Sequence, residues 1–199
     1  LLKRIPVQAG LGGGSSDAAG TLRLLARLWR TGRTRGSLER LARALGADVP
    51  FFLRGGTALG EGRGDVVTPL APLTGVHCVI LVPRFGVSTA RAYTRVKTQL
   101  TPRQALSSMA QAWAKSADRR ARSPDVHSIC LYNSFEATVF EDHPVLARMK
   151  RRLVDEGAIS AALSGTGSAV FGLVRTRAEA RRVAGACAEP GLSTYLARP

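Results

Sequence analysis

Residues 5–19, "IPVQAGLGGGSSDAA", place four glycines and two serines between an apolar lead-in and an alanine-rich stretch. A run so dense in glycine costs conformational entropy on folding, so it indicates a backbone that must turn sharply or lie close to another group. Residues 16–30, "SDAAGTLRLLARLWR", follow with apolar and arginine side chains on different faces of a helix, and Ser15 or Ser16 is its expected N-cap. A loop of this kind, leading into a helix N-terminus, favours an anion such as phosphate.

The loop fits neither of the two common phosphate-binding patterns. The dinucleotide pattern G-x-G-x-x-G fails, because the sixth position is Ser15 when counted from Gly10 and Asp17 when counted from Gly12. The Walker pattern fails because no Gly-Lys-Ser/Thr follows. Two interpretations remain: a cradle of backbone N–H groups for phosphates, with Mg²⁺ offsetting their charge, or a turn that only caps a helix.

Composition predicts a globular protein. The 199 residues are 45% hydrophobic, which is enough for a core, and no apolar run approaches the roughly 20 residues of a membrane span. Cys78, Cys130 and Cys187 are odd in number and widely spaced, so they indicate neither a disulfide framework nor a zinc site, and a cytoplasmic setting is expected. The first residues, "LLKRIP", contain no secretory signal and no initiator methionine, so we expect a chain that begins inside a gene product.

The formal charge of +15 raises the question of nucleic acid. Only four of the 29 basic residues are lysines, and the arginines are scattered along the chain. The clusters "DRRARS" and "RMKRR" are not interleaved with aromatic residues that could stack on bases. We therefore expect no nucleic-acid partner.

The first half of the chain reads as helices followed by short strands. A second helix is expected from Ser37, as N-cap, to Gly46 in a left-handed C-cap position. The segment 47–53, "ADVPFFL", is expected to be extended around Pro50, and β-like pieces follow at 55–62 and 65–73. Proline and glycine at 69–75 predict a domain boundary, which gives domains 1–72 and 73–199.

The second half predicts a split βαβ, ferredoxin-like layer. The arginine-rich stretch 115–125 is expected to be a mobile loop. The expected elements are a strand at 77–82, a helix at 88–99, a helix at 143–157 with Pro144 in its first turn, strands at 158–164 and 169–174, a helix with a Thr176–Glu179 capping box, and a strand at 193–197.

Three motifs that follow one another along the chain resemble those of a known family. "PVQAGLGGGSSDAA" (6–19) resembles the phosphate loop of the GHMP kinases (galactose, homoserine, mevalonate and phosphomevalonate kinases), which use it in place of a Walker sequence. With "LGADVPFFLRGGTALGEGRGD" (45–65) and "VSTARAY" (87–93), the chain is similar to the branch that uses ATP to phosphorylate the 2-hydroxyl of a cytidine diphosphate-linked methylerythritol in non-mevalonate isoprenoid biosynthesis. The resemblance implies an α+β fold: part of a ribosomal-S5-like nucleotide-binding domain, then a ferredoxin-like C-terminal domain.

The resemblance also implies site residues. Asp48, in "GADVP", matches the catalytic base, although on its own chemistry it could be a loop aspartate bonded to its own backbone. Thr89 and Tyr93 match the substrate side, and otherwise read as a helix cap and a core or surface tyrosine. No residue is assigned to the metal, Mg²⁺. The ATP-binding residues would be Lys3, Pro6, Val7, Gln8, Ala9, Gly10, Leu11, Gly12, Gly13, Gly14, Ser15 and Ser16.

A third glycine motif lies at residues 165–168, in "SGTGSAVFG". Gly165, Thr166, Gly167 and Ser168 match the family segment that folds near the nucleotide loop, and they also suit a tight hairpin. "YNSFE" resembles a family segment that is often Asn-Asp-x-Glu, with Ser134 at the second position. His77, His127 and His143 match no catalytic position.

The family's first-motif lysine and its cytidine clamp do not precede Leu1, and Lys3 lies too close to the loop to replace that lysine. The resemblance therefore implies an N-terminally truncated copy, and we expect the chain alone to be inactive or poorly folded. Two alternatives stay open: another GHMP kinase acting on a different small molecule, or a non-catalytic basic binding protein on the same fold. The sequence does not reveal the oligomeric state.

Overall fold

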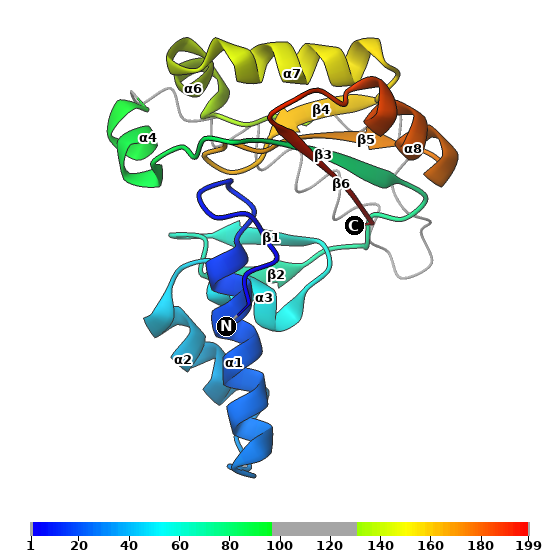
Figure 1. The fold of residues 1–199 in the computed structure, drawn as a ribbon. Helices are drawn as coiled ribbons and strands as arrows, with labels where there is room; N and C mark the ends of the chain where they lie inside the picture. The colour runs from blue at the N-terminus through cyan, green and yellow to red at the C-terminus, as the bar shows by residue number, and fades with distance from the viewer. Residues whose placement is uncertain (1, 97–130, 199) are drawn as a thin grey trace. The chain divides into compact units, whose positions relative to one another are not determined.

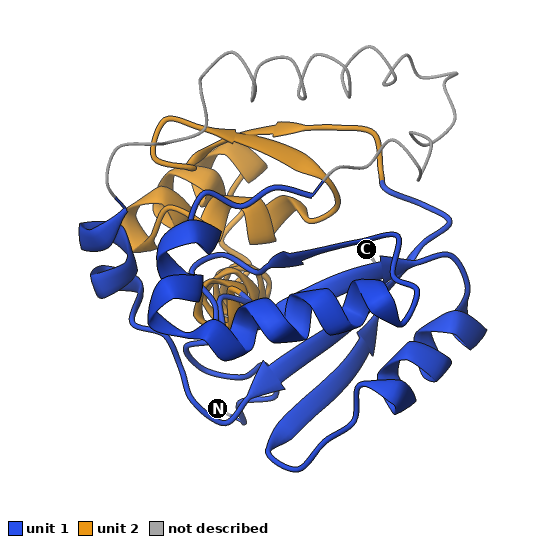
Figure 2. Ribbon diagram, turned by 90° about the horizontal axis from the view of Figure 1, so that it is seen from above, with its two compact units in different colours: residues 1–11, 73–199 blue, residues 12–72 orange. Residues whose placement is uncertain are grey.

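The computed structural model describes residues 2–96 and 131–198 of the chain. It contains two compact units, shown in different colours in Figure 2. Unit 1 combines Leu1–Leu11 with Leu73–Pro199, and unit 2 is Gly12–Pro72. The glycine loop thus begins in unit 1 and ends in unit 2. The domain boundary near residue 72 stays a prediction, because compact units and family domains need not coincide.

Unit 1 is built on a four-stranded antiparallel sheet in the order β4-β5-β3-β6 (Figure 1). The chain order of these strands reproduces the ferredoxin-like arrangement, because the first strand lies between the third and the fourth. The strands are β3 (His77–Pro83), β4 (Ser160–Leu163), β5 (Val170–Val174) and β6 (Leu192–Ala197). The predicted split βαβ layer is confirmed.

Helices α7 (Pro144–Asp155) and α8 (Arg177–Ala186) pack on this sheet. One continuous core joins them to β3, with Leu146, Leu153 and Val183 against Val79 and Leu81, all buried. Both helices begin as the sequence predicted. Pro144 occupies the first turn of α7, and a reciprocal capping box between Thr176 and Glu179 starts α8.

Two short helices complete the described part of unit 1. Helix α4 (Thr89–Arg95) begins after Ser88, whose side chain accepts a hydrogen bond from the Arg91 N–H, and α6 (Glu136–Asp142) precedes α7. The predicted helix at 88–99 is confirmed as far as Arg95. Residues 97–99 and the segment 115–125 lie outside the described residues.

Unit 2 consists of three helices and one hairpin. Helices α1 (Gly13–Leu28), α2 (Arg35–Leu45) and α3 (Val49–Arg54) pack around a small core of Ala19, Ala42, Val49 and Leu53. Strands β1 (Ala58–Glu61) and β2 (Val66–Pro69) pair in antiparallel fashion, which confirms the two predicted β-like pieces.

Three local predictions for residues 34–54 were wrong. Residues 49–54 form a helix and not an extended segment, because proline is tolerated in the first turn, where its missing N–H leaves no helical bond unmade. Helix α2 is capped by Thr34, whose Oγ1 accepts from the Ser37 N–H, so Ser37 lies inside the helix. Gly46 has a φ of 168°, which is extended and not left-handed.

The helices in the described part of the chain are all too short or too polar to cross a membrane.

Candidate functional site

The first half of the glycine loop is bound to the third glycine motif inside unit 1. The Ala169 N–H donates to the Ala9 carbonyl at 3.0 Å, and the Ser168 N–H donates to the Gln8 carbonyl at 3.3 Å. Ala9 and Ala169 are both buried, at 1% and 0% exposure, in a small apolar cluster with Val82. The sequence prediction that these two motifs lie near each other therefore has a geometric counterpart: the two backbones are hydrogen-bonded.

Gly10 lies against the backbone of Ser164 and Gly167, at the third glycine motif. It adopts a φ of +71°, and a Cβ on it would lie 1.9 Å from the carbonyl oxygen of Ser164. The Ser164 hydroxyl donates to the Gly10 carbonyl at 2.9 Å. No residue with a side chain fits this position, because both the left-handed conformation and the contact exclude a Cβ.

The loop carries left-handed backbone at alternating positions. Gln8, Gly10 and Gly12 have φ values of 56°, 71° and 65°. Turns with successive N–H groups in such conformations form concavities that bind anions. The beginning of the loop lies at the surface of unit 1, where Lys3 and Val7 are exposed and Pro6 is half-buried.

The second half of the loop is the N-terminus of α1 in unit 2. Gly12 is the N-cap, and it makes no side-chain capping bond. The first backbone bond of the helix runs from the Ser16 N–H to the Gly12 carbonyl at 2.9 Å, so the amides of the preceding residues have no partner within the helix. Those amides, on Gly13, Gly14 and Ser15, lie at the positive end of a 16-residue helix.

The prediction that Ser15 or Ser16 caps this helix was wrong. Both serines lie within its first turn, because the left-handed conformation of Gly12 starts the helix earlier. The consequence is chemical. Ser15 and Ser16 are helix residues and do not serve as the N-cap, and Gly12 has no side chain that could accept from the free amides.

Asp48 stands at the N-cap position of α3 and is exposed. Its side chain makes no capping hydrogen bond to that helix, so the alternative of a locally bonded loop aspartate is not what the structure contains. The backbone of Gly64, in the turn of the β1–β2 hairpin, approaches it: a Cβ on Gly64 would lie 4.0 Å from Asp48 Oδ1. The Asp48 carboxylate is therefore exposed and is not used as a helix cap.

Thr89 and Tyr93 both lie on α4, and both contact the surroundings of the third glycine motif. Thr89 Oγ1 lies 3.1 Å from Thr166 Oγ1. Tyr93 is 65% exposed, and its ring meets that of Phe135 edge to face at 4.9 Å. The helix cap is Ser88, so the alternative role of Thr89 as a cap does not apply.

The third glycine motif itself turns its hydroxyls inward. Ser168 is 1% exposed and donates to the Phe85 carbonyl at 2.7 Å, while Thr166 is 6% exposed. Gly165 and Gly167 have φ values of 54° and 84°, and the Gly167 N–H donates to the Ser164 carbonyl. The motif thus closes the β4–β5 hairpin, as one of its two interpretations predicted, and it also contacts the loop.

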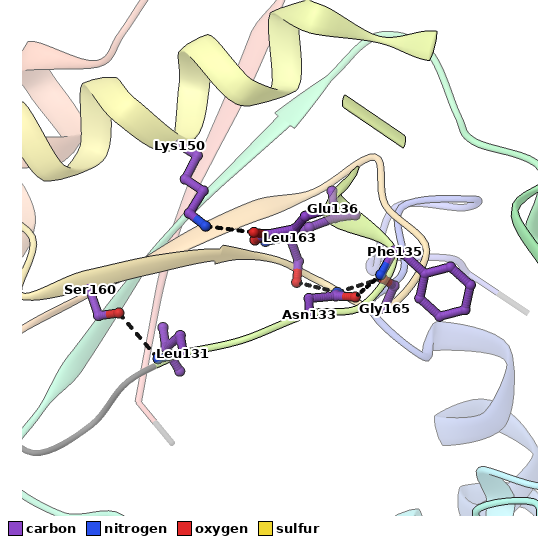
Figure 3. A network of polar contacts seen from close by, with 8 residues as sticks. All are labelled: Leu131, Asn133, Phe135, Glu136, Lys150, Ser160, Leu163 and Gly165. Carbon is purple, nitrogen blue, oxygen red and sulfur yellow. Dashed lines mark hydrogen bonds and ion pairs between the residues drawn. The ribbon is translucent and has the colours of Figure 1, made fainter. Parts of the chain in front are cut away.

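A polar network that the sequence analysis did not assign to the site supports this hairpin (Figure 3). Asn133 donates from Nδ2 to the carbonyls of Leu163 and Gly165, at 2.8 and 2.7 Å. Glu136 accepts the Leu163 N–H at 2.9 Å and pairs with Lys150 at 2.6 Å. The sequence signal was the Asn and Glu of "YNSFE", but nothing local links them to a turn some 30 residues later.

Neither cysteine in the described residues has the character of a nucleophile. Burial raises the pKa of the Cys78 thiol to about 11. Burial also raises the pKa of Cys187, which is fully enclosed in the core, although the Arg152 charge acts in the opposite direction. Within residues 2–96 and 131–198, no group of three or more His, Cys, Asp or Glu side chains is placed to hold a metal ion.

The comparisons with known proteins agree on a family. The profile for the GHMP kinases N terminal domain matches residues 1–56, and that for the GHMP kinases C terminal matches residues 105–191. A 4-diphosphocytidyl-2-C-methyl-D-erythritol kinase of Pelotomaculum thermopropionicum is 43% identical over 184 residues, which are 92% of this chain and 62% of that protein. The kinase of the same name from Gloeobacter violaceus is 39% identical over 203 residues, covering 98% of this chain and 65% of that protein.

A solved structure gives the same answer. The crystal structure of a 4-(cytidine 5'-diphospho)-2C-methyl-D-erythritol kinase superposes with a TM-score of 0.76 at 37% identity, covering 99% of this chain and 69% of the other. The chain thus spans just under two thirds of the length of the two curated relatives above.

Proposed function

Since the chain belongs to the GHMP kinases, and within them to the 4-diphosphocytidyl-2-C-methyl-D-erythritol kinases, we propose that it serves ATP-dependent phosphorylation of that cytidine diphosphate-linked methylerythritol. The acceptor is its 2-hydroxyl, in a step of non-mevalonate isoprenoid biosynthesis. The reaction is the transfer of the γ-phosphoryl group of ATP from the β-phosphate oxygen to the acceptor oxygen, with release of ADP and of the hydroxyl proton.

One observation carries the proposal: the glycine loop is a backbone cradle that starts an uncapped helix. The amides of Gly13, Gly14 and Ser15 precede the first bond of α1, and the cap residue supplies no side-chain oxygen to them. The helix dipole alone stabilises an anion at an exposed site by about 0.3–1 kcal/mol, so a triphosphate needs several N–H donors in addition. Mg²⁺ would neutralise part of the phosphate charge, and no described residue is assigned to it.

We assign the remaining roles by chemistry. Asp48, exposed and free of a capping bond, would accept the proton of the acceptor hydroxyl. Thr89 would contact the acceptor through its hydroxyl, and the 65% exposed ring of Tyr93 could stack on the cytosine. Lys3, exposed at the start of the loop, would contact the nucleotide or its phosphates. A cytoplasmic setting stays a prediction.

The test is a phosphoryl-transfer assay on the chain with ATP and Mg²⁺. Acceptors are offered separately: the cytidine diphosphate conjugate, galactose, homoserine and mevalonate. ADP release is followed by a coupled assay, and the product by ³¹P NMR. Transfer to the conjugate alone is the expected specificity, whereas transfer to another acceptor would assign the chain to a different GHMP reaction.

Nucleotide binding is measured beside turnover by titration calorimetry. ATP binding without turnover would support the nucleotide site alone and not the choice of acceptor. Absence of any nucleotide affinity, together with salt-dependent retention on DNA, would overturn the proposal in favour of a basic binding protein. The net charge of +15 is the observation that suggests this alternative.

A further inference from the structure

Strand β4 is an edge strand, and its last residue is held from outside the sheet. Among the described strands it pairs with β5 alone, so the groups on its other side need partners elsewhere. At Leu163 both groups find one: Glu136 Oε1 accepts the N–H at 2.9 Å, and the carbonyl accepts from Asn133 Nδ2 at 2.8 Å (Figure 3). The end of this strand is therefore fixed by side chains.

Asn133 does more than complete the edge. The same Nδ2 donates to the carbonyl of Gly165 at 2.7 Å, so the amide bridges the residues on either side of Ser164. Its own orientation is fixed, because Oδ1 accepts the Phe135 N–H at 2.9 Å. An amide is the side chain that this geometry requires, since it donates on one side and accepts on the other.

The residue enclosed by this bridge reaches the glycine loop. The Ser164 hydroxyl donates to the Gly10 carbonyl at 2.9 Å, and a Cβ on Gly10 would lie 1.9 Å from the Ser164 carbonyl oxygen. The hairpin then continues the contact through the Ala169 N–H, which donates to the Ala9 carbonyl. The position of Ser164 thus sets the position of the loop backbone.

Glu136 is itself anchored on helix α7. Its second oxygen pairs with Lys150 at 2.6 Å, and both side chains are mostly buried, with 17% and 29% of their surface exposed. Because the carboxylate divides its oxygens between Lys150 and the Leu163 N–H, the hairpin is attached to a helix of the main core.

We propose that Asn133 is a positioning residue for the glycine loop: by bridging Leu163 and Gly165 it aims the Ser164 hydroxyl at Gly10, with Glu136 and Lys150 as its support. The claim that this positioning serves nucleotide binding rests on the proposed function. The claim that it orders the loop does not, and the two can be measured separately.

The test substitutes Asn133→Asp. The shape is kept and an oxygen can still accept the Phe135 N–H, but the donor is replaced by an acceptor facing two carbonyls. Ser164→Ala is the second variant, because it removes only the hydroxyl that reaches Gly10, and Ser164→Thr restores a hydroxyl. Glu189→Gln is the matched control: it breaks an ion pair with Arg152 on the same helix α7, at 2.8 Å, without touching the hairpin.

Two quantities are measured: hydrogen exchange of the Ser168 and Ala169 amides by NMR, and affinity for ATP by calorimetry. Asn133→Asp and Ser164→Ala should each speed exchange and weaken ATP binding by about tenfold, as expected from the loss of one or two hydrogen bonds. Ser164→Thr should recover much of the loss, and Glu189→Gln should change neither quantity.

A folded Asn133→Asp variant with unchanged exchange and unchanged ATP affinity would overturn the proposal. An equal effect of Glu189→Gln on exchange and on ATP affinity would also overturn it. Loss of any ion pair of α7 would then have the same consequence, and Asn133 would have no specific role in positioning the loop. If the unaltered chain binds no ATP, the proposed function fails, and the exchange rates alone decide whether Asn133 orders the loop. If Asn133→Asp does not fold, the comparison of Ser164→Ala with Ser164→Thr tests the same proposal, and equal exchange and equal ATP affinity of these two variants would overturn it.

Discussion

Replacing Gly10 by alanine should be the most damaging single change in the glycine loop. An alanine Cβ would lie 1.9 Å from the Ser164 carbonyl oxygen, 2.9 Å from its carbon and 3.0 Å from the Gly167 nitrogen. All three atoms belong to the backbone, so no side chain can rotate away. Relief requires the loop and the hairpin to separate, and that breaks the hydrogen bonds through which Ser168 and Ala169 hold the loop.

The magnitude follows from two contributions. Gly10 has a φ of +71°, and a left-handed conformation costs an L-residue about 1–2 kcal/mol. Forcing a methyl group into a packed contact costs about 1–3 kcal/mol. Together they predict a loss of about 2–5 kcal/mol in the free energy of unfolding, which lowers the urea midpoint by about 1 M or more.

The control is Gly14→Ala, the same change four residues later. Gly14 lies in α1 at negative φ, and nothing stands within 4 Å of its added Cβ. Alanine is favoured over glycine in a helix by about 1 kcal/mol, so this variant should be as stable as the original chain or more so. Urea unfolding followed by circular dichroism measures both, and equal midpoints for Gly10→Ala and the original chain would refute the reasoning.

Three further predictions address single groups. In a form of the enzyme that shows turnover, Asp48→Asn should lower it about 10²- to 10⁴-fold without altering the fold, while Asp65→Asn, in the same unit, should leave it unchanged. Equal turnover of the two variants would remove the base assignment. Gly12→Ala should destabilise unit 2, because its Cβ would lie 2.5 Å from the Phe52 ring. In a double-mutant cycle, Phe52→Ala should relieve this clash and so offset part of the lost stability, but the strain of about 1–2 kcal/mol from the left-handed backbone should remain. Cys78, with a pKa of about 11, should hold at pH 8 about 100-fold less thiolate than a thiol of pKa 9, so it should react more slowly with thiol reagents. Its rate, followed by peptide mass spectrometry, should rise tenfold per pH unit up to that pKa, and a rate that levels off near pH 9 would contradict the prediction.

The second half of the chain was predictable because its signals are local. Apolar residues follow one another in 77–83 and 170–174, Pro144 and the Thr176 capping box mark helix starts, and each signal acts within a few residues. The helix N-caps of unit 2 were less predictable. Thr34 and Ser37 are both good caps three residues apart, and the helix begins after Thr34.

Residues 49–54 illustrate a different limit. Pro50 indicates an extended segment when the residue before it is considered alone, yet it equally suits the first turn of a helix. Val49 and Leu53 lie one turn apart, and both are buried against the core of unit 2. Burial of that apolar stripe decided the conformation, and only the packed neighbours supply it.

The sequence by itself determined that a glycine loop leads into a helix, that phosphate suits it, and that a second glycine turn follows a strand near the C-terminus. It could not distinguish one glycine from another. Gly10 must lack a side chain because the Ser164 backbone, distant in sequence, lies against it, whereas Gly14 meets nothing. Likewise Asn133 is an ordinary polar residue until the sheet brings it to Leu163 and Gly165. Local pattern indicates where turns and helices are favoured, and only tertiary contact decides which atoms meet.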